Sequence, residues 1–157
     1  MDSWRLIVKV VLARTVGCIG VVLASSLLFA GVVAAHGPDE AGVVQVAFDQ
    51  PVTNIPGESL VALEVSYGPG AKDLSHRHAD SAFIMAYVLS GAIRSQVAGQ
   101  PPRVFKAGET WQEVPGDHHV VSENASATEP ARLLAVFVVD SSQSQALTTF
   151  DADSGNR

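Results

Sequence analysis

GAKDLSHRHADSAFIMAYVLSG, residues 70–91, is the stretch of sequence that decides the fold of this chain. It places His76 and His78 one residue apart on an expected strand, and it ends in a turn glycine, Gly91. Because side chains alternate between the two faces of a strand, both imidazoles point to the same side. Imidazole nitrogen binds most divalent first-row metals. The stretch therefore predicts two ligands of a metal site.

GETWQEVPGDHHVVSEN, residues 108–124, carries the other histidine pair. Pro115 and Gly116 predict a turn, and the strand that follows begins with His118 and His119. Adjacent strand residues face opposite sides, so only one of these two imidazoles can join His76 and His78. Three imidazoles with an open position are typical of a reactive metal site rather than a closed structural one.

The two stretches resemble the two sequence motifs of the cupin family. Residues at motif positions are Gly70, His76, His78 and Gly91 in the first motif, and Gly108, Gly116 and His119 in the second. The glutamate of the first motif is absent, since Ala82, Phe83 or Ile84 stands where it is counted. The resemblance covers residues 60–140 and implies the cupin double-stranded β-helix, a jelly-roll barrel. It also implies a divalent metal held by His76, His78 and His119, with His118 pointing away.

Two carboxylates are candidates for the missing acidic group. Asp80 has the strand parity of His78 and becomes a substitute ligand if the strand stays regular through it. Glu113 precedes the Pro115-Gly116 turn and is a candidate for a hydrogen bond to a ligand histidine or for the substitute carboxylate. Solvated surface carboxylates are the alternative for both.

The rest of the chain predicts an all-β domain. Short apolar or alternating runs separated by glycine and proline indicate strands at 43–48, 60–67, 83–89, 92–97, 103–106 and 133–139. We expect an N-terminal extension with an edge strand at 36–59, the barrel at 60–140 and a polar C-terminal tail at 141–157. The run FIMAYVL at 83–89 suits a strand buried on both faces, which predicts a homodimer that covers sheet surface.

Residues 1–35 have the pattern of an export signal. Arg5, Lys9 and Arg14 precede an uncharged run from 15 to 35, and the run ends in the small residues that a signal peptidase needs. We expect cleavage before His36 and a periplasmic or secreted domain that is not held at the membrane. The alternative is a retained membrane anchor at 15–35, because 21 uncharged residues are enough to span a bilayer.

The acidic composition limits the partners. The chain has a formal charge of -6, and without residues 1–35 it keeps 7 basic and 15 acidic residues. Such a chain predicts no nucleic-acid or anionic-lipid partner, which leaves a small-molecule ligand or substrate.

For function, the resemblance implies a metal-dependent, dioxygenase-like enzyme of the quercetinase type acting on a small organic substrate. A metal-binding or small-molecule-sensing cupin without turnover is the alternative, and an isomerase or decarboxylase is the third. Three imidazoles suit Fe, Mn, Ni, Cu or Zn, so the metal is not identified.

Overall fold

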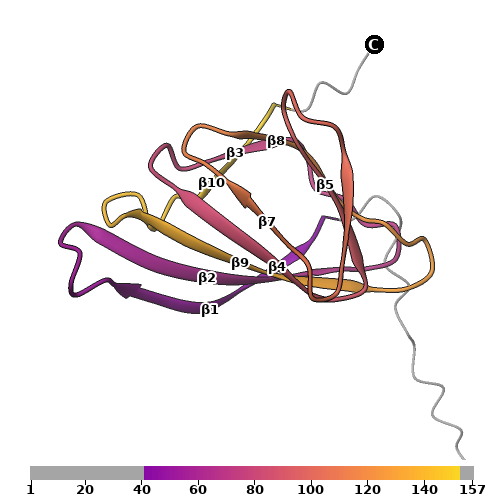
Figure 1. Ribbon diagram of the computed structural model, residues 1–157, viewed down its shortest axis with the longest axis horizontal. Helices are drawn as coiled ribbons and strands as arrows, with labels where there is room; N and C mark the ends of the chain where they lie inside the picture. The colour runs from indigo at the N-terminus through magenta and orange to yellow at the C-terminus, as the bar shows by residue number, and fades with distance from the viewer. Residues whose placement is uncertain (1–40, 153–157) are drawn as a thin grey trace, which may run out of the picture. The chain divides into compact units, whose positions relative to one another are not determined.

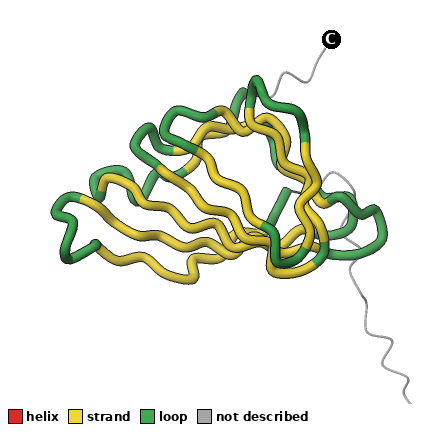
Figure 2. The backbone as a smooth tube through the Cα atoms, viewed as in Figure 1, coloured by secondary structure: helices red, strands yellow, loops and turns green. Residues whose placement is uncertain are grey.

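A computed structural model describes residues 41–152 of the 157-residue chain. All the regular secondary structure in this part is β-strand, as Figure 2 shows. The predicted all-β class is therefore confirmed for these residues. The expected signal or membrane helix at 1–35 lies outside them, and no helix within 41–152 is long and apolar enough to cross a membrane.

Ten strands form two antiparallel five-stranded sheets that face each other (Figure 1). The first sheet has the order β1(Val43–Pro51), β2(Glu58–Tyr67), β9(Ala131–Asp140), β4(Phe83–Ser90) and β7(Thr110–Glu113). The second has the order β10(Thr148–Phe150), β3(His76–His78), β8(His118–Asn124), β5(Ala92–Val97) and β6(Arg103–Lys106). The first histidine pair and the second therefore lie on neighbouring strands, β3 and β8.

The core lies between the inner faces of the sheets. In β2, Val61 and Val65 are buried, and the inward side chains alternate with outward ones. Phe137 and Val139 of β9 and Ile84 of β4 continue the same apolar layer. Val65, Ile84 and Phe137 of this layer also line a cavity between the sheets.

The prediction that residues 83–89 are buried on both faces is wrong for the single chain. Ile84, Ala86 and Val88 are buried, but the alternate side chains of β4 face outward. The outward residues are between 37% and 41% exposed, namely Phe83, Met85, Tyr87 and Leu89. One face of the run packs in the core, and the other leaves apolar surface open.

Glycine is required at the turn between β4 and β5. Gly91 has φ +70°, and a Cβ placed there would lie 2.6 Å from the Pro130 carbonyl oxygen. Gly116, with φ +87°, makes the turn before β8 and so determines where the second histidine pair begins.

Both flanks of residues 60–140 contribute strands to the sheets. β1 pairs with β2 along the edge of the first sheet. In the segment expected as a polar tail, Thr148–Phe150 form β10 and pair with β3. Its three residues lie opposite His78, Arg77 and His76, so this segment reaches the functional site.

Candidate metal centre

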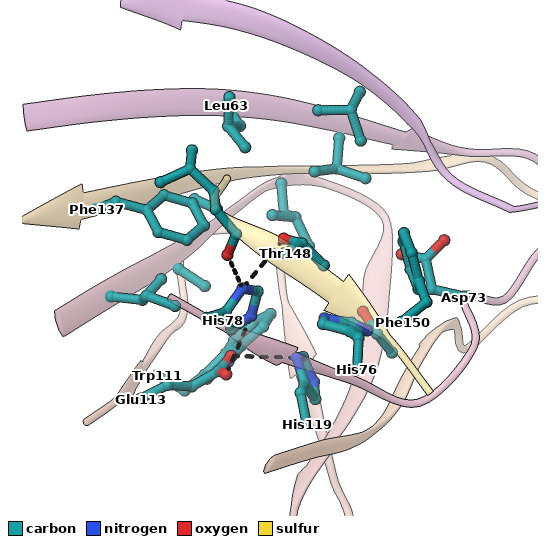
Figure 3. A pocket seen from close by; sticks show the side chains of 18 of the residues that line it. Leu63, Asp73, His76, His78, Trp111, Glu113, His119, Phe137, Thr148 and Phe150 are labelled. Carbon is teal, nitrogen blue, oxygen red and sulfur yellow. Dashed lines mark hydrogen bonds and ion pairs between the residues drawn. The ribbon is translucent and has the colours of Figure 1, made fainter. Parts of the chain in front are cut away.

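The three histidines lie together on the inner face of the second sheet. His76 of β3 is the direct cross-strand partner of His119 on β8, and His78 follows on the same face of β3. One nitrogen atom from each ring lies within 4.8 Å of the others. The structure thus brings together the three side chains that the motif spacing predicts (Figure 3).

A hydrogen bond on the far side holds each ring in place. His76 Nδ1 donates to the Leu74 carbonyl oxygen at 2.8 Å, and His78 Nδ1 donates to that of Leu147 at 3.3 Å. His119 Nε2 lies 2.9 Å from Ser95 Oγ. These contacts leave Nε2 of His76, Nε2 of His78 and Nδ1 of His119 available to a common ligand, as is usual for metal-binding histidines.

Glu113 is the carboxylate at this site. It is 2% exposed, and its Oε1 lies 3.2 Å from His119 Nδ1 while its Oε2 lies 3.4 Å from His78 Nε2. Trp111 Nε1 donates a hydrogen bond to Oε1 at 3.1 Å, so this oxygen is held in position. Oε2 has no hydrogen-bond partner within residues 41–152. A buried carboxylate oxygen without a partner is costly, and a cation between the four side chains would satisfy it.

The carboxylate comes from a different strand than the family motif expects. Counting back from Gly91 puts the motif glutamate at Ile84, and in the structure Ile84 of β4 is the direct cross-strand partner of Glu113 on β7. Partners in an antiparallel pair have Cβ atoms about 5 Å apart on the same face. Glu113 therefore occupies nearly the place of the absent glutamate.

The charges of His119, His76 and Glu113 suit a divalent cation. Burial, and to a lesser extent the neighbouring His76 and His78, lower the pKa of His119 to about 4 against the opposing charge of Glu113. Burial also lowers the pKa of His76. For Glu113 burial raises the pKa, but the interactions with His78 and His119 outweigh it and hold the pKa below its usual value. Neutral imidazoles with one ionised carboxylate are a donor set for transition metals.

Asp80 and His118 lie away from this centre. Asp80 is exposed in the turn between β3 and β4, where the chain leaves the strand before Asp80, so its parity with His78 does not apply. His118 faces outward, as its parity with His119 predicts, and its Nε2 contacts Ser75 Oγ at 2.8 Å and Asp151 Oδ2 at 2.7 Å. Neither residue lines the cavity.

A cavity of about 260 Å³ opens beside the four ligand candidates. The inner face of the first sheet forms one wall, and β10 with the residue before it forms another. Phe150 of β10 packs edge-on against His76 with ring centroids 5.5 Å apart, and Figure 3 shows it beside this ring. Sequence reasoning missed the contribution of β10, because a three-residue strand in a polar segment has no periodicity that would identify it.

At the end of the cavity near His76, Tyr67 and Asp73 form a second polar group. The Tyr67 hydroxyl donates to Asp73 Oδ2 and lies 2.9 Å from Ser122 Oγ, while Asp73 Oδ1 accepts from Gly42 N at 2.8 Å. Burial, together with the charge of Asp73, raises the pKa of Tyr67 well above its usual value. The group therefore stays a neutral phenol paired with a carboxylate, and it ties β2 to the start of β1.

Comparison with known proteins supports one family. The model of the cupin domain family matches residues 63–137. Among solved structures, a conserved protein of unknown function from Klebsiella pneumoniae with a double-stranded β-helix domain has a TM-score of 0.56 at 18% identity, covering 76% of this chain and 91% of its own. No curated protein sequence matches.

Two enzymes share the fold at low identity. DMSP lyase DddQ from Ruegeria pomeroyi has a TM-score of 0.55 at 18% identity, covering 74% of this chain and 54% of its own. Oxalate decarboxylase from Bacillus subtilis has a TM-score of 0.54 at 23% identity, covering 71% of this chain and 28% of its own. The two facing antiparallel sheets and the family match agree, and they support a cupin superfamily domain in this part of the chain.

Proposed function

We propose that His76, His78, His119 and Glu113 hold one divalent transition metal. The observation that carries this proposal is Glu113, whose buried Oε2 has no hydrogen-bond partner in the described part of the chain and lies 3.4 Å from Nε2 of His78, one of the three clustered imidazoles. A set of three nitrogens and one oxygen suits Fe, Mn, Ni, Cu or Zn better than Ca²⁺ or Mg²⁺, which prefer oxygen ligands.

We further propose that the domain is a metal-dependent, dioxygenase-like enzyme acting on a small organic substrate. A bound metal would supply Lewis acidity to a substrate oxygen. The chain supplies the other parts: a largely apolar cavity, and the carboxylate of Glu113 beside the metal, which can accept a proton from a substrate hydroxyl. Trp111 would keep Glu113 in position through Oε1 during that transfer.

The second candidate is a metal-holding or small-molecule-sensing module without turnover, and the third is an isomerase or decarboxylase. The likeness to a lyase and a decarboxylase, at 18% and 23% identity, concerns the fold and does not transfer their reactions. Glu113 favours the enzyme over the sensor, because a sensor that only binds a ligand does not need a proton acceptor beside the metal.

Metal analysis of the protein purified from its own host, followed by oxygen uptake with a panel of phenols, tests the function. We expect a stoichiometric transition metal and substrate-dependent oxygen consumption that Glu113→Gln abolishes. Stoichiometric metal with no turnover on any compound would support the sensor. Absence of metal after gentle purification, with no uptake on adding Fe, Mn, Ni, Cu or Zn, would refute the metal site.

We also propose that the domain is exported. The support is the basic start, the uncharged run at 15–35 and the small residues at its end. N-terminal sequencing of protein from the periplasm or medium should begin at His36, within a residue or two. Recovery of the uncut chain in the membrane fraction would support the anchor instead.

A further inference from the structure

The cavity has an apolar wall opposite the metal ligands. Its apolar side chains come mainly from the inner faces of β2, β4 and β9, and they include Leu63, Val65, Ile84, Leu133, Ala135 and Phe137. Aliphatic and aromatic side chains offer no hydrogen bond, so a ligand group that lies on this wall must itself be apolar.

Within the described residues, no lysine or arginine lines this cavity. Among the residues that line it, the ones with a formal charge are Asp73 and Glu113, and both are acidic. Two arginines on strands of the second sheet face outward. Arg77 contacts the Gly116 carbonyl oxygen on the surface, and Arg94 pairs with Glu123. An anionic group inside the cavity would therefore meet carboxylates and apolar carbons rather than a cation.

A bound divalent metal would compensate one anionic oxygen at most. As a carboxylate placed beside His78 and His119, Glu113 would neutralise one of the two positive charges, which leaves one for a ligand oxygen. Asp73 already accepts hydrogen bonds from Tyr67 and Gly42, so it adds negative charge to the cavity without offering a donor. A second anionic group on the ligand would find no lysine or arginine among the lining residues, and the lining hydroxyls of Ser122 and Thr148 already contact Tyr67 and His78.

We infer that the cavity takes a compact, apolar ligand that presents a phenolic or enolic head, ionised at one oxygen at most, to the metal and carries no further anionic group. This inference deepens the proposed function and rests on it for the metal-bound head. The other part of the inference, that the body of the ligand is apolar, rests on the apolar wall alone. Dicarboxylates, sugar phosphates and other ligands with two anionic ends are excluded by the same argument. The volume of about 260 Å³ limits the ligand to a small molecule.

Two probes with the same head separate the charge effect from metal binding. 4-Methylcatechol and 3,4-dihydroxybenzoate share the two adjacent hydroxyls and differ in a methyl against a carboxylate. We expect isothermal titration of the zinc-loaded full-length protein to give at least tenfold tighter binding of 4-methylcatechol. Equal affinities, tighter binding of the carboxylate, or binding of neither probe would overturn the inference.

A substitution in the apolar wall and a titration of the metal-free protein distinguish failure of this inference from failure of the proposed function. Leu63→Lys adds a cation to the wall and should remove or reverse the preference, while Val104→Lys, on the outer face of β6, should leave it unchanged. Circular dichroism and retained zinc check that both variants fold. If the protein holds no zinc but the EDTA-treated form still prefers 4-methylcatechol, the proposed function fails and the apolar pocket stands. If zinc is held without a preference, the inference alone fails.

Discussion

The two sheets of this domain differ on both of their faces. The inner face of the second sheet carries the three histidines, and its outer face is polar, with Arg94 of β5 directly opposite Glu123 of β8. The inner face of the first sheet carries the apolar wall and Glu113, and its outer face is largely apolar. One cross-strand row on that outer face runs through Phe48, Ala62, Val136 and Met85.

This difference separates the ligand-bearing sheet from the sheet that shapes the cavity. The polar outer face of the second sheet can stay in contact with solvent. The position of this sheet is therefore determined by the packing of its inner face. The outer face of the first sheet retains exposed apolar side chains that a single chain does not cover, such as Met85 at 37% exposed and Phe48 at 47%.

The largest effect is expected from removing a ligand on the inner face of the second sheet. His76→Ala should sharply reduce the metal retained, because the ion loses one of its imidazole ligands, a ring that the Leu74 carbonyl oxygen already orients. Elemental analysis after dialysis measures it. His118→Ala, on the outer face of the same sheet, is the matched control and should keep its metal. Equal metal content in wild type and His76→Ala would contradict the site.

The metal-free protein should lose stability as the pH falls from 6.5 towards 4. An unfolded imidazole titrates near 6.5, whereas His119 in the folded chain titrates at about 4, so the unfolded state binds more protons in this interval. The full stability is present above pH 6.5, and about 2–3 kcal/mol of it should be lost by pH 4.5. Urea unfolding in EDTA at several pH values measures this.

The lowered pKa values of His76 and Glu113 also reduce the stability of the folded chain as the pH falls. Glu113 contributes only below its unfolded pKa near 4.5. His119→Gln should flatten the slope between pH 6.5 and 4, whereas His118→Ala should retain most of it. A wild-type stability that does not change across this interval would show that the imidazole of His119 is not buried in its neutral form.

The contribution of the first sheet to the metal is tested by Glu113→Gln. The amide keeps the shape but removes the negative charge, and we expect metal affinity to fall by at least about tenfold, because the ion loses its one anionic ligand. A chelator competition titration measures the change. Asp80→Ala is the matched carboxylate control, since Asp80 is exposed in a turn. If Asp80→Ala lost metal affinity instead, the carboxylate that binds the metal would come from the turn between β3 and β4.

The outer face of the first sheet should mediate self-association into a homodimer. A second copy is the expected partner, because a two-fold axis brings the same sheet face of both subunits together. The Glu64–Arg132 ion pair (2.6 Å) also lies on this face. Met85→Lys should weaken the dimer at least tenfold, since burial of one such side chain contributes about 1.5–3 kcal/mol.

Sedimentation over a concentration series measures the dimer. Val104→Lys replaces an apolar side chain of similar exposure, 40%, on the polar face of the second sheet and should leave the mass unchanged. A monomer at micromolar concentration in the wild type would contradict the prediction.

The smallest effect is expected on the outer face of the second sheet. Arg94 and Glu123 lie 3.4 Å apart with side chains 50% and 30% exposed, so solvent screens the pair. Arg94→Gln should change the free energy of unfolding by less than about 1 kcal/mol. A loss above this in urea unfolding would mean that this face is covered by a partner, contrary to its polar character.

The sequence determined those features that depend on neighbours along one strand. The spacing of His76 and His78, and the adjacency of His118 and His119, decide which imidazoles share a face, because strand parity is local. The all-β class follows similarly from short runs between turns. The structure keeps all of these assignments.

The tertiary structure alone decided which side chains from distant strands meet. Glu113 reaches the histidines because β7 pairs with β4 in a register that puts it opposite Ile84, and this register depends on how the core packs. Contacts between strands far apart in sequence also determine three other features. They place Asp80 in a turn away from the cavity, β10 beside His76, and one face of β4 at the surface. Strand parity is a property of the local backbone, whereas strand register is a property of the packed domain.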